Sequence, residues 1–252
     1  MWSRGSQRFV PWLDAALSFI YPEVCQLCRS RPARRCEGYV CAGCRELVRV
    51  IQPPFCDRCG LPFEGAITTS FQCANCREMK LHFAVARSAV AARGPVLDAI
   101  HRYKYQGQLW FEDFLADYFI EGAREWIQRE PCDGLVPVPL FPVKERERGF
   151  NQAHRLAERL SRALSVPVED RLLKRVVPTP SQTRLSRTQR ADNMRRAFAL
   201  IGTPQLDQRR LVLVDDVFTT GATTSACAKL LLKAGAAHVV VWTVARAEFH
   251  GG

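Results

Sequence analysis

From about residue 83 onward, short apolar runs alternate with longer segments in which apolar residues recur at helical spacing. The short runs have lengths typical of strands, and the longer segments are typical of helices. The predicted strands cover 85–90, 135–138, 211–214 and 239–244. The predicted helices cover 95–105, 110–128, 151–164 and 223–234. The strand–helix–strand order from 211 to 244 is a βαβ unit, so we expect a parallel sheet in an α/β domain.

Two polar segments interrupt this alternation. Residues 144–149 are basic and predict a loop after the strand at 135–138. Residues 178–192 are rich in Thr, Ser, Gln and Arg and predict a mobile polar loop. Before residue 80 the pattern differs, because cysteines dominate and helical periodicity is weak. We therefore expect a Cys-rich module at 1–80 and an α/β domain at 81–252.

The composition is that of a globular protein, since 47% of the 252 residues are hydrophobic and 24% are charged. An apolar stretch at 9–21 is interrupted by Pro11 and Asp14. This interruption favours an amphipathic helix packed on the body of the protein over a targeting segment. No segment has the length of a membrane span. With no export signal in the sequence, we expect a cytoplasmic protein in a reducing compartment.

The cysteines are concentrated near the N-terminus. Nine of the eleven lie between Cys25 and Cys76, and eight of these form Cys-x-x-Cys pairs. In a reducing compartment, such pairs are more typical of metal ligands than of disulfides. Four thiolates saturate a tetrahedral zinc ion, so we expect two structural zinc ions. The two sets of four, with nearly identical spacing, are Cys25, Cys28, Cys41 and Cys44, and Cys56, Cys59, Cys73 and Cys76.

Several alternatives stay open for these cysteines. Redox pairs and iron–sulfur ligation are the competing chemistries, although four pairs at this spacing favour zinc. Pairs can also be shared between the two sets, because the assignment rests only on proximity in the sequence. Cys36 lies between two pairs and can substitute for a ligand. Cys132 and Cys227 are predicted to be small core residues.

The segment 211–224 places two adjacent carboxylates, Asp215 and Asp216, at the C-terminal end of an apolar strand. A short loop containing Thr219, Thr220 and Gly221 then opens a helix. Ligands of parallel sheets bind at this end of the strands, and the amides of a helix N-terminus bind phosphate. Carboxylates accept hydrogen bonds from ribose hydroxyls or hold a hydrated magnesium ion. A phosphate next to a vicinal diol is a 5-phosphoribosyl group.

Other interpretations of this segment fit less well. It is neither Gly-x-x-x-x-Gly-Lys-Ser/Thr nor Gly-x-Gly-x-x-Gly. A plain helix N-cap after acids at a strand end would explain single residues, but it would not explain the whole ordered segment. The segment resembles the PRPP-binding signature of type I phosphoribosyltransferases. The resemblance implies that fold, a parallel sheet flanked by helices, with the acids on the ribose 2- and 3-hydroxyls and the loop around the 5-phosphate. The matching residues are Asp215, Asp216, Val217, Phe218, Thr219, Thr220, Gly221, Ala222 and Thr223.

A second predicted strand end, at 138, is followed by the cationic residues Lys144, Arg146 and Arg148. Such side chains can neutralise pyrophosphate, the leaving group of phosphoribosyl transfer. For Lys144 and Arg146 a solvated charge run is an equal alternative, because glutamates alternate with them. Arg148 is the stronger candidate, because Gly149 and the predicted N-cap Asn151 would fix its direction.

Positive charge is concentrated in one region of the chain. The net charge is +11, and residues 144–196 contain 14 Lys and Arg against 6 Asp and Glu. This region includes the segment expected to cover the leaving group. The concentration suits a polyanionic partner, either PRPP or nucleic acid.

A closer resemblance is to the ComF family, which is associated with competence and the use of external DNA. It is carried by the string 148–152, by Lys104 in a Lys-Tyr-x-Gly element, and by the Cys-rich module. The resemblance implies a zinc ribbon before a phosphoribosyltransferase domain, with Lys104 on the pyrophosphate side. It also implies a flexible loop whose candidate residues are Gln182, Arg187, Arg190 and Asn193.

Three functions are compatible with these features. The first is an enzyme that binds PRPP with magnesium and transfers the phosphoribosyl group to a nitrogen nucleophile. The second is a catalytically silent sensor of PRPP or nucleotides that docks to a DNA-uptake helicase-type protein. The third is a single-stranded-DNA-binding protein that reuses the fold. The intact pair Asp215 and Asp216 favours the first two, because these acids would repel DNA phosphates.

Overall fold

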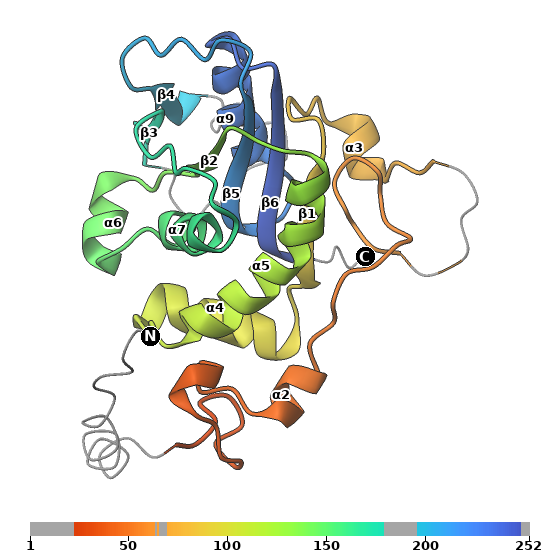
Figure 1. The fold of residues 1–252 in the computed structure, drawn as a ribbon, viewed down its shortest axis with the longest axis vertical. Helices are drawn as coiled ribbons and strands as arrows, with labels where there is room; N and C mark the ends of the chain where they lie inside the picture. Colours follow the sequence, from red (N-terminus) through yellow and green to blue (C-terminus); the bar gives the residue numbers. More distant parts are fainter. Residues whose placement is uncertain (1–22, 64, 66–69, 179–195, 248–252) are drawn as a thin grey trace, which may run out of the picture.

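The computed structural model describes residues 23–63, 65, 70–178 and 196–247 (Figure 1). The helix expected within 9–21 lies outside the described residues. The four loop candidates of the preceding section also lie outside them; these are Gln182, Arg187, Arg190 and Asn193.

The centre of the fold is a four-stranded parallel sheet. Its strands are β1 (Ala86–Ala91), β2 (Gly134–Pro137), β5 (Arg210–Phe218) and β6 (His238–Arg246), in the spatial order β1-β6-β5-β2. Every neighbouring pair is parallel. All four predicted strands are therefore confirmed. Their near-continuous apolar character follows from burial on both faces, which is typical of parallel sheets.

Helices cover both faces of the sheet, and β5 separates the two cores. Val212 and Val214 pack in the core that contains the buried residues of α4 (Gly94–Gln106), α5 (Phe111–Arg129) and α7 (Gln152–Leu164). Leu211 and Leu213 point the other way and pack with α9 (Ala222–Lys233). This alternation is the period-two pattern of a strand. The expected fold class, a parallel sheet flanked by helices and preceded by a Cys-rich module, is confirmed.

The sequence predicted a loop for the basic residues 144–149, and this prediction is wrong. Residues 142–148 form helix α6 (Pro142–Arg148), with Pro142 in its first turn and Gly149 at its C-cap. Gly149 has φ of 81°, a left-handed conformation that suits glycine at a helix end. The alternating Lys, Glu and Arg residues are good helix formers, and this propensity outweighs the loop expectation based on charge.

A small second sheet was not predicted. It consists of β3 (Leu173–Arg175) and β4 (Phe198–Leu200), which pair in antiparallel orientation. Each strand has three residues, too few for a recognisable alternation of polar and apolar positions. β3 nevertheless matters for the site, because Arg175 is its last residue.

The two sets of cysteines pack against opposite parts of the molecule (Figure 1). The segment that carries the first set contains η1 (Arg35–Glu37) and α2 (Ala42–Glu46), and its buried residues share a core with α4 and α5. Gly38 fits closely there, because a Cβ on it would lie 2.7 Å from the backbone nitrogen of Phe114. The second set contains α3 (Ala74–Glu78) and shares the core on the α9 side.

Irregular segments pair with both outer strands of the sheet. Along β1, Ile51 donates to the carbonyl of Ala89 (2.9 Å), and Ala91 donates to that of Arg49 (2.8 Å). Along β2, Leu135 donates to the carbonyl of Pro167 and accepts from the amide of Glu169, both at 2.8 Å. Within the described residues, no helix combines the length and apolar character that a membrane crossing requires.

Candidate functional site

The paired acids lie inside β5 rather than beyond its end. The sequence predicted a strand ending at 214, but β5 continues to Phe218. Pairing with β6 extends this far, with Asp215 opposite Thr243 and Phe218 opposite Arg246. Adjacent strand residues start toward opposite faces, but the Lys104 ammonium group acts on both carboxylates, since it contacts Asp216 and its charge favours the ionised form of Asp215.

Asp216 is buried and forms an ion pair with Lys104. The contact joins Asp216 Oδ2 to Lys104 Nζ, which comes from the last turn of α4. The side chains are 5% and 17% exposed, so water screens the pair weakly. Burial is the main cause that lowers the pKa of Lys104 to about 8; the charge of Asp215 opposes the shift, and that of Arg148 adds to it. Lys104 therefore changes charge close to neutral pH.

Asp215 lies among three cations. Burial raises its pKa to about 6, although the positive charges of Lys104, Arg175 and Arg148 favour the ionised form. Its carboxylate also accepts a hydrogen bond from the amide of Asp216 at 2.9 Å. Burial lowers the pKa of Arg175 from its ordinary value. Sequence reasoning did not single out Arg175, because β3 is too short to indicate where its side chain points.

The loop between β5 and α9 is closely packed. Gly221 has φ of 83°, and a Cβ there would lie 2.6 Å from Cζ of Phe218. Both facts require glycine at this position. Thr220 Oγ1 accepts from the amide of Ala222 at 3.4 Å, where α9 begins. The predicted order of strand, Thr- and Gly-containing loop and helix is thus present, and Thr219 is exposed at its tip.

Of the three predicted cations of α6, Arg148 is placed nearest the acids. Its guanidinium lies 5.6 Å from the ring centroid of Tyr105 and contacts Gln152 Oε1. Burial lowers the pKa of Arg148, and the charge of Asp215 opposes this shift. Lys144 and Arg146 are exposed on α6. Arg148 is only partly exposed, and the role of all three cations toward a ligand stays a prediction.

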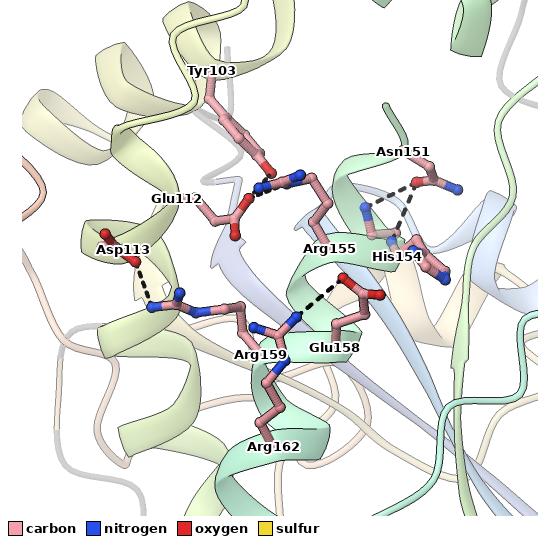
Figure 2. A network of polar contacts seen from close by, with 10 residues as sticks. Tyr103, Glu112, Asp113, Asn151, His154, Arg155, Glu158, Arg159 and Arg162 are labelled. Atoms are coloured by element: carbon pink, nitrogen blue, oxygen red, sulfur yellow. Dashed lines mark hydrogen bonds and ion pairs between the residues drawn. The ribbon is translucent and has the colours of Figure 1, made fainter. Parts of the chain in front are cut away.

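A buried polar network fixes α4 and α7 relative to each other (Figure 2). Tyr103 is fully buried and donates to Glu112 Oε2 at 3.1 Å. Arg155 of α7 contacts the same carboxylate oxygen. Tyr103 precedes Lys104 in α4, so this network holds the helix that carries the cation. Sequence reasoning missed Glu112 and Arg155. The available signal was that Glu112 falls among the apolar positions of α5 that face the core.

The N-terminus of α7 is also fixed. Asn151 Oδ1 accepts from the amides of Ala153 (2.9 Å) and His154 (3.5 Å), so the predicted N-cap is confirmed (Figure 2). Asn151 Nδ2 donates to the carbonyl of Val138 at 3.1 Å. This bond ties the start of α7 to the end of β2 and fixes the turn that follows Arg148.

Each set of four cysteines closes on itself, with all four sulfur atoms within 4.8 Å of one another. The sulfur–sulfur distances include 3.7 Å for Cys25 and Cys44, and 3.6 Å for Cys59 and Cys73. Zinc–sulfur bonds of about 2.3 Å in a tetrahedron require sulfur–sulfur distances of about 3.8 Å. Both sets therefore fit zinc, and grouping within each set is confirmed. We call Cys25, Cys28, Cys41 and Cys44 cluster 1, and Cys56, Cys59, Cys73 and Cys76 cluster 2.

Comparisons with known proteins agree with these features. The double zinc ribbon domain family matches residues 16–77. Competence protein F of Haemophilus influenzae is 32% identical over 82% of this chain and 90% of its own length. The DNA utilization protein YhgH of Escherichia coli is 31% identical over 89% of this chain and 97% of its own. Competence protein ComFC of Bacillus subtilis is 27% identical over 82% of this chain and 84% of its own.

Two solved structures are similar to part of this chain. A purine phosphoribosyltransferase from Pyrococcus horikoshii aligns with 53% of this chain and 82% of its own, at 18% identity and a TM-score of 0.34. An adenine phosphoribosyltransferase from Thermoanaerobacter pseudethanolicus aligns with 65% of this chain and 90% of its own, at 15% identity and a TM-score of 0.35.

Proposed function

The chain belongs to the ComF family of competence and DNA-utilisation proteins, and on that premise we propose that it binds PRPP with magnesium, or a related 5-phosphoribosyl ligand. The observation that carries the proposal is the buried pair of Asp216 and Lys104 beside the loop that opens α9. At the carboxyl end of a parallel strand, the carboxylate can accept hydrogen bonds from a diol, and the cation can bind a phosphate group. The reducing cytoplasm, where thiolates retain zinc, is the proposed location.

In this proposal the ligand's ribose lies against the acids of β5. Asp215 and Asp216 accept hydrogen bonds from the 2- and 3-hydroxyls. The 5-phosphate binds to the first amides of α9, where the helix dipole favours a negative charge. The hydroxyls of Thr219, Thr220 and Thr223 add further donors. A close-packed glycine at 221 lets the backbone approach the phosphate.

Lys104 and Arg148 bind the pyrophosphate side of the ligand. Without ligand, Lys104 neutralises Asp216. When the ribose hydroxyls hydrogen-bond to that acid, the ammonium group becomes available to the pyrophosphate oxygens. Arg148 approaches from the end of α6, with its direction set by Gln152 and the ring of Tyr105. Magnesium enters with PRPP and reduces the charge of the pyrophosphate.

A transfer reaction at this site needs no protein nucleophile. The nitrogen of an acceptor forms a bond to C1 of the ribose while the bond from C1 to the pyrophosphate oxygen breaks. The electron pair leaves with pyrophosphate, and the acceptor loses a proton to water. The protein contributes orientation and neutralisation of the leaving group by Lys104 and Arg148.

A second candidate function is a silent adaptor that binds single-stranded DNA or a DNA-uptake helicase-type protein. The observation in its favour is that residues 144–196 contain 14 Lys and Arg but only 6 Asp and Glu. This charge suits a phosphate backbone as well as PRPP. The two functions differ in one measurable respect, because only an enzyme releases pyrophosphate in the presence of an acceptor.

Calorimetric titration of the purified full chain with PRPP and magnesium tests the first proposal. We expect binding by the wild type and its loss in Asp216→Asn. Asp117→Asn, at an exposed acid of α5, is the matched control and should bind normally. A wild type that binds no PRPP would overturn the proposal. A screen for pyrophosphate release with nitrogen acceptors then separates an enzyme from a sensor.

A further inference from the structure

Arg246 is a fully buried arginine at the end of β6. Its Nη1 donates to the carbonyls of Phe218 (3.2 Å) and Thr219 (2.8 Å), which belong to the end of β5 and the following loop. Its guanidinium also lies 4.8 Å from the ring centroid of Phe218. A charge in a buried position must be paired, and these carbonyls supply only part of the compensation.

Arg246 also donates to the carbonyl of Ala247 at 2.8 Å, and it contacts cluster 2. Nη2 donates to Sγ of Cys59 at 3.5 Å, and Nε donates to the carbonyl of Cys59 at 3.3 Å. Four thiolates around one zinc ion carry a net charge of about −2. All four cysteines of cluster 2 are buried, so this charge is poorly solvated. A guanidinium in contact with one sulfur reduces the cost of burying it.

Two further contacts join cluster 2 to the same loop and helix. Asn75, which lies between Cys73 and Cys76, donates from Nδ2 to the carbonyl of Thr220 at 3.2 Å. Ser225, in the first turn of α9, accepts from the amide of His82 at 3.0 Å. The carbonyls of Thr219 and Thr220 are therefore both bound from the side of cluster 2.

Cluster 1 is arranged differently. Its Cys28 is exposed, so water can solvate part of its charge. Beside this cluster, Arg45 donates to the carbonyl of Glu37 at 2.7 Å and pairs with Asp117 of α5. Neither partner belongs to the loop between β5 and α9. Cluster 1 thus stabilises the helices of the other face.

We propose that Arg246 is a positioning residue through which zinc in cluster 2 fixes the loop at 219–221. The metal holds the sulfur of Cys59 in place as a thiolate, and Arg246 bridges that thiolate to the carbonyl of Thr219. The loop amides then face the phosphate in a defined orientation. Without zinc, the thiolate that Arg246 contacts is no longer held in place, and its hydrogen bonds to the loop are less firmly positioned. The consequence for ligand affinity rests on the proposed function.

The test compares Arg246→Lys with Arg45→Lys, which makes the same substitution beside cluster 1. Lysine keeps the charge, but its donors share one nitrogen and cannot span the separate acceptors that Nε, Nη1 and Nη2 of Arg246 reach. Three quantities are measured on the full chain: zinc release to a chelator, hydrogen exchange of the amides at 219–223, and affinity for PRPP with magnesium. For Arg246→Lys we expect one of two zinc ions to leave roughly tenfold faster or more. Exchange at 219–223 should rise and affinity should fall, whereas Arg45→Lys should leave the loop unchanged.

Unchanged zinc release and unchanged loop exchange in Arg246→Lys would overturn the inference. Asn75→Ala serves if Arg246→Lys does not fold, because it removes only the contact with Thr220. We expect faster loop exchange in Asn75→Ala with both zinc ions retained, and unchanged exchange would count against the inference. The zinc and exchange measurements use no ligand. Failure of the wild type to bind PRPP would therefore refute the proposed function and leave this test intact.

Discussion

The ammonium group of Lys104 contacts the carboxylate of Asp216 and so joins the last turn of α4 to the strand that leads into the loop at 219–221. Both groups are largely buried, and each is the nearest compensation for the other's charge. The pair therefore has a structural role without ligand and a proposed binding role with it.

We expect Lys104→Met to destabilise the protein, because Asp216 would then be a buried charge without its partner. Breaking a buried pair in this way costs about 3–5 kcal/mol. The double variant Lys104→Met with Asp216→Leu should recover most of that loss, since both charges are removed. Urea denaturation measures the free energy of unfolding of the wild type, the two single variants and the double variant. If the loss of unfolding free energy in the double variant equals the sum of the losses in the two single variants, the two residues do not interact directly.

Affinity for PRPP with magnesium should depend on pH in both directions. Lys104 is protonated below its pKa of about 8, and Asp215 is ionised above its pKa of about 6. Binding needs the cation and the carboxylate together, so it should be tightest between these values. Calorimetry from pH 5 to 9 measures the profile. In Lys104→Met the decline above pH 8 should disappear, and its persistence would assign that decline to another group.

Asp215→Asn should stabilise the folded protein at pH 7 while weakening ligand binding. The pKa of Asp215 is raised to about 6 by burial, above its value in the unfolded chain. The native state therefore holds this proton more tightly, and stability falls as pH rises from about 4 to 6. An amide cannot ionise, so the variant should avoid a cost of up to about 3 kcal/mol. Thermal melts of both proteins at pH 5 and 7 test this. A variant that melts at a lower temperature than the wild type at pH 7 would contradict it.

Much of the fold was predictable because the parallel sheet is buried on both faces. The strands at 85–90 and 239–244 are continuous apolar runs, and the segment 211–224 combines strand, turn and helix signals in order. The exceptions have local causes. Helix α6 consists of charged residues without an apolar stripe, and β3 and β4 have only three residues each. Their positions depend on contacts with distant segments, which composition does not record.

The candidate site was predictable where its residues are adjacent in the sequence. Asp215, Asp216 and the loop to 223 form one segment, and the cysteines follow a known metal-binding spacing. The residues that sequence reasoning missed act across long separations. Arg246 contacts Cys59 from 187 positions away, and Arg155 reaches Glu112 from another helix. A charged residue at the end of a buried strand indicates that a partner exists, but it does not identify that partner.

Metal analysis of the purified protein under reducing conditions should find two zinc ions per chain. Each cluster has four sulfur atoms at distances that fit a tetrahedral ion. Cys28→Ser and Cys59→Ser should each retain one zinc ion, because the clusters do not share ligands. Iron in place of zinc, or full metal content in either variant, would contradict the assignment.

If the cationic region 144–196 also binds DNA, affinity should fall steeply with salt. Each phosphate neutralised contributes a slope of roughly 0.7–0.9 log units per log unit of salt, because counterions are released. PRPP should compete with single-stranded DNA, since both would use Arg148. Filter binding at several salt concentrations measures this. Unchanged affinity at low salt in the triple variant Arg148→Ala, Arg187→Ala, Arg190→Ala would place a DNA site elsewhere.

The segments 49–51 and 167–169 cover part of each outer strand of the central sheet. Unpaired border strands invite other chains to add strands, which leads to aggregation. Here the stretch between the two cysteine clusters protects β1, and the turn after α7 protects β2. A fragment that starts near residue 81 would keep the segment that pairs with β2 and lose the segment that pairs with β1. We therefore expect the α/β portion alone to aggregate more readily than the full chain, in which residues 49–51 pair with β1.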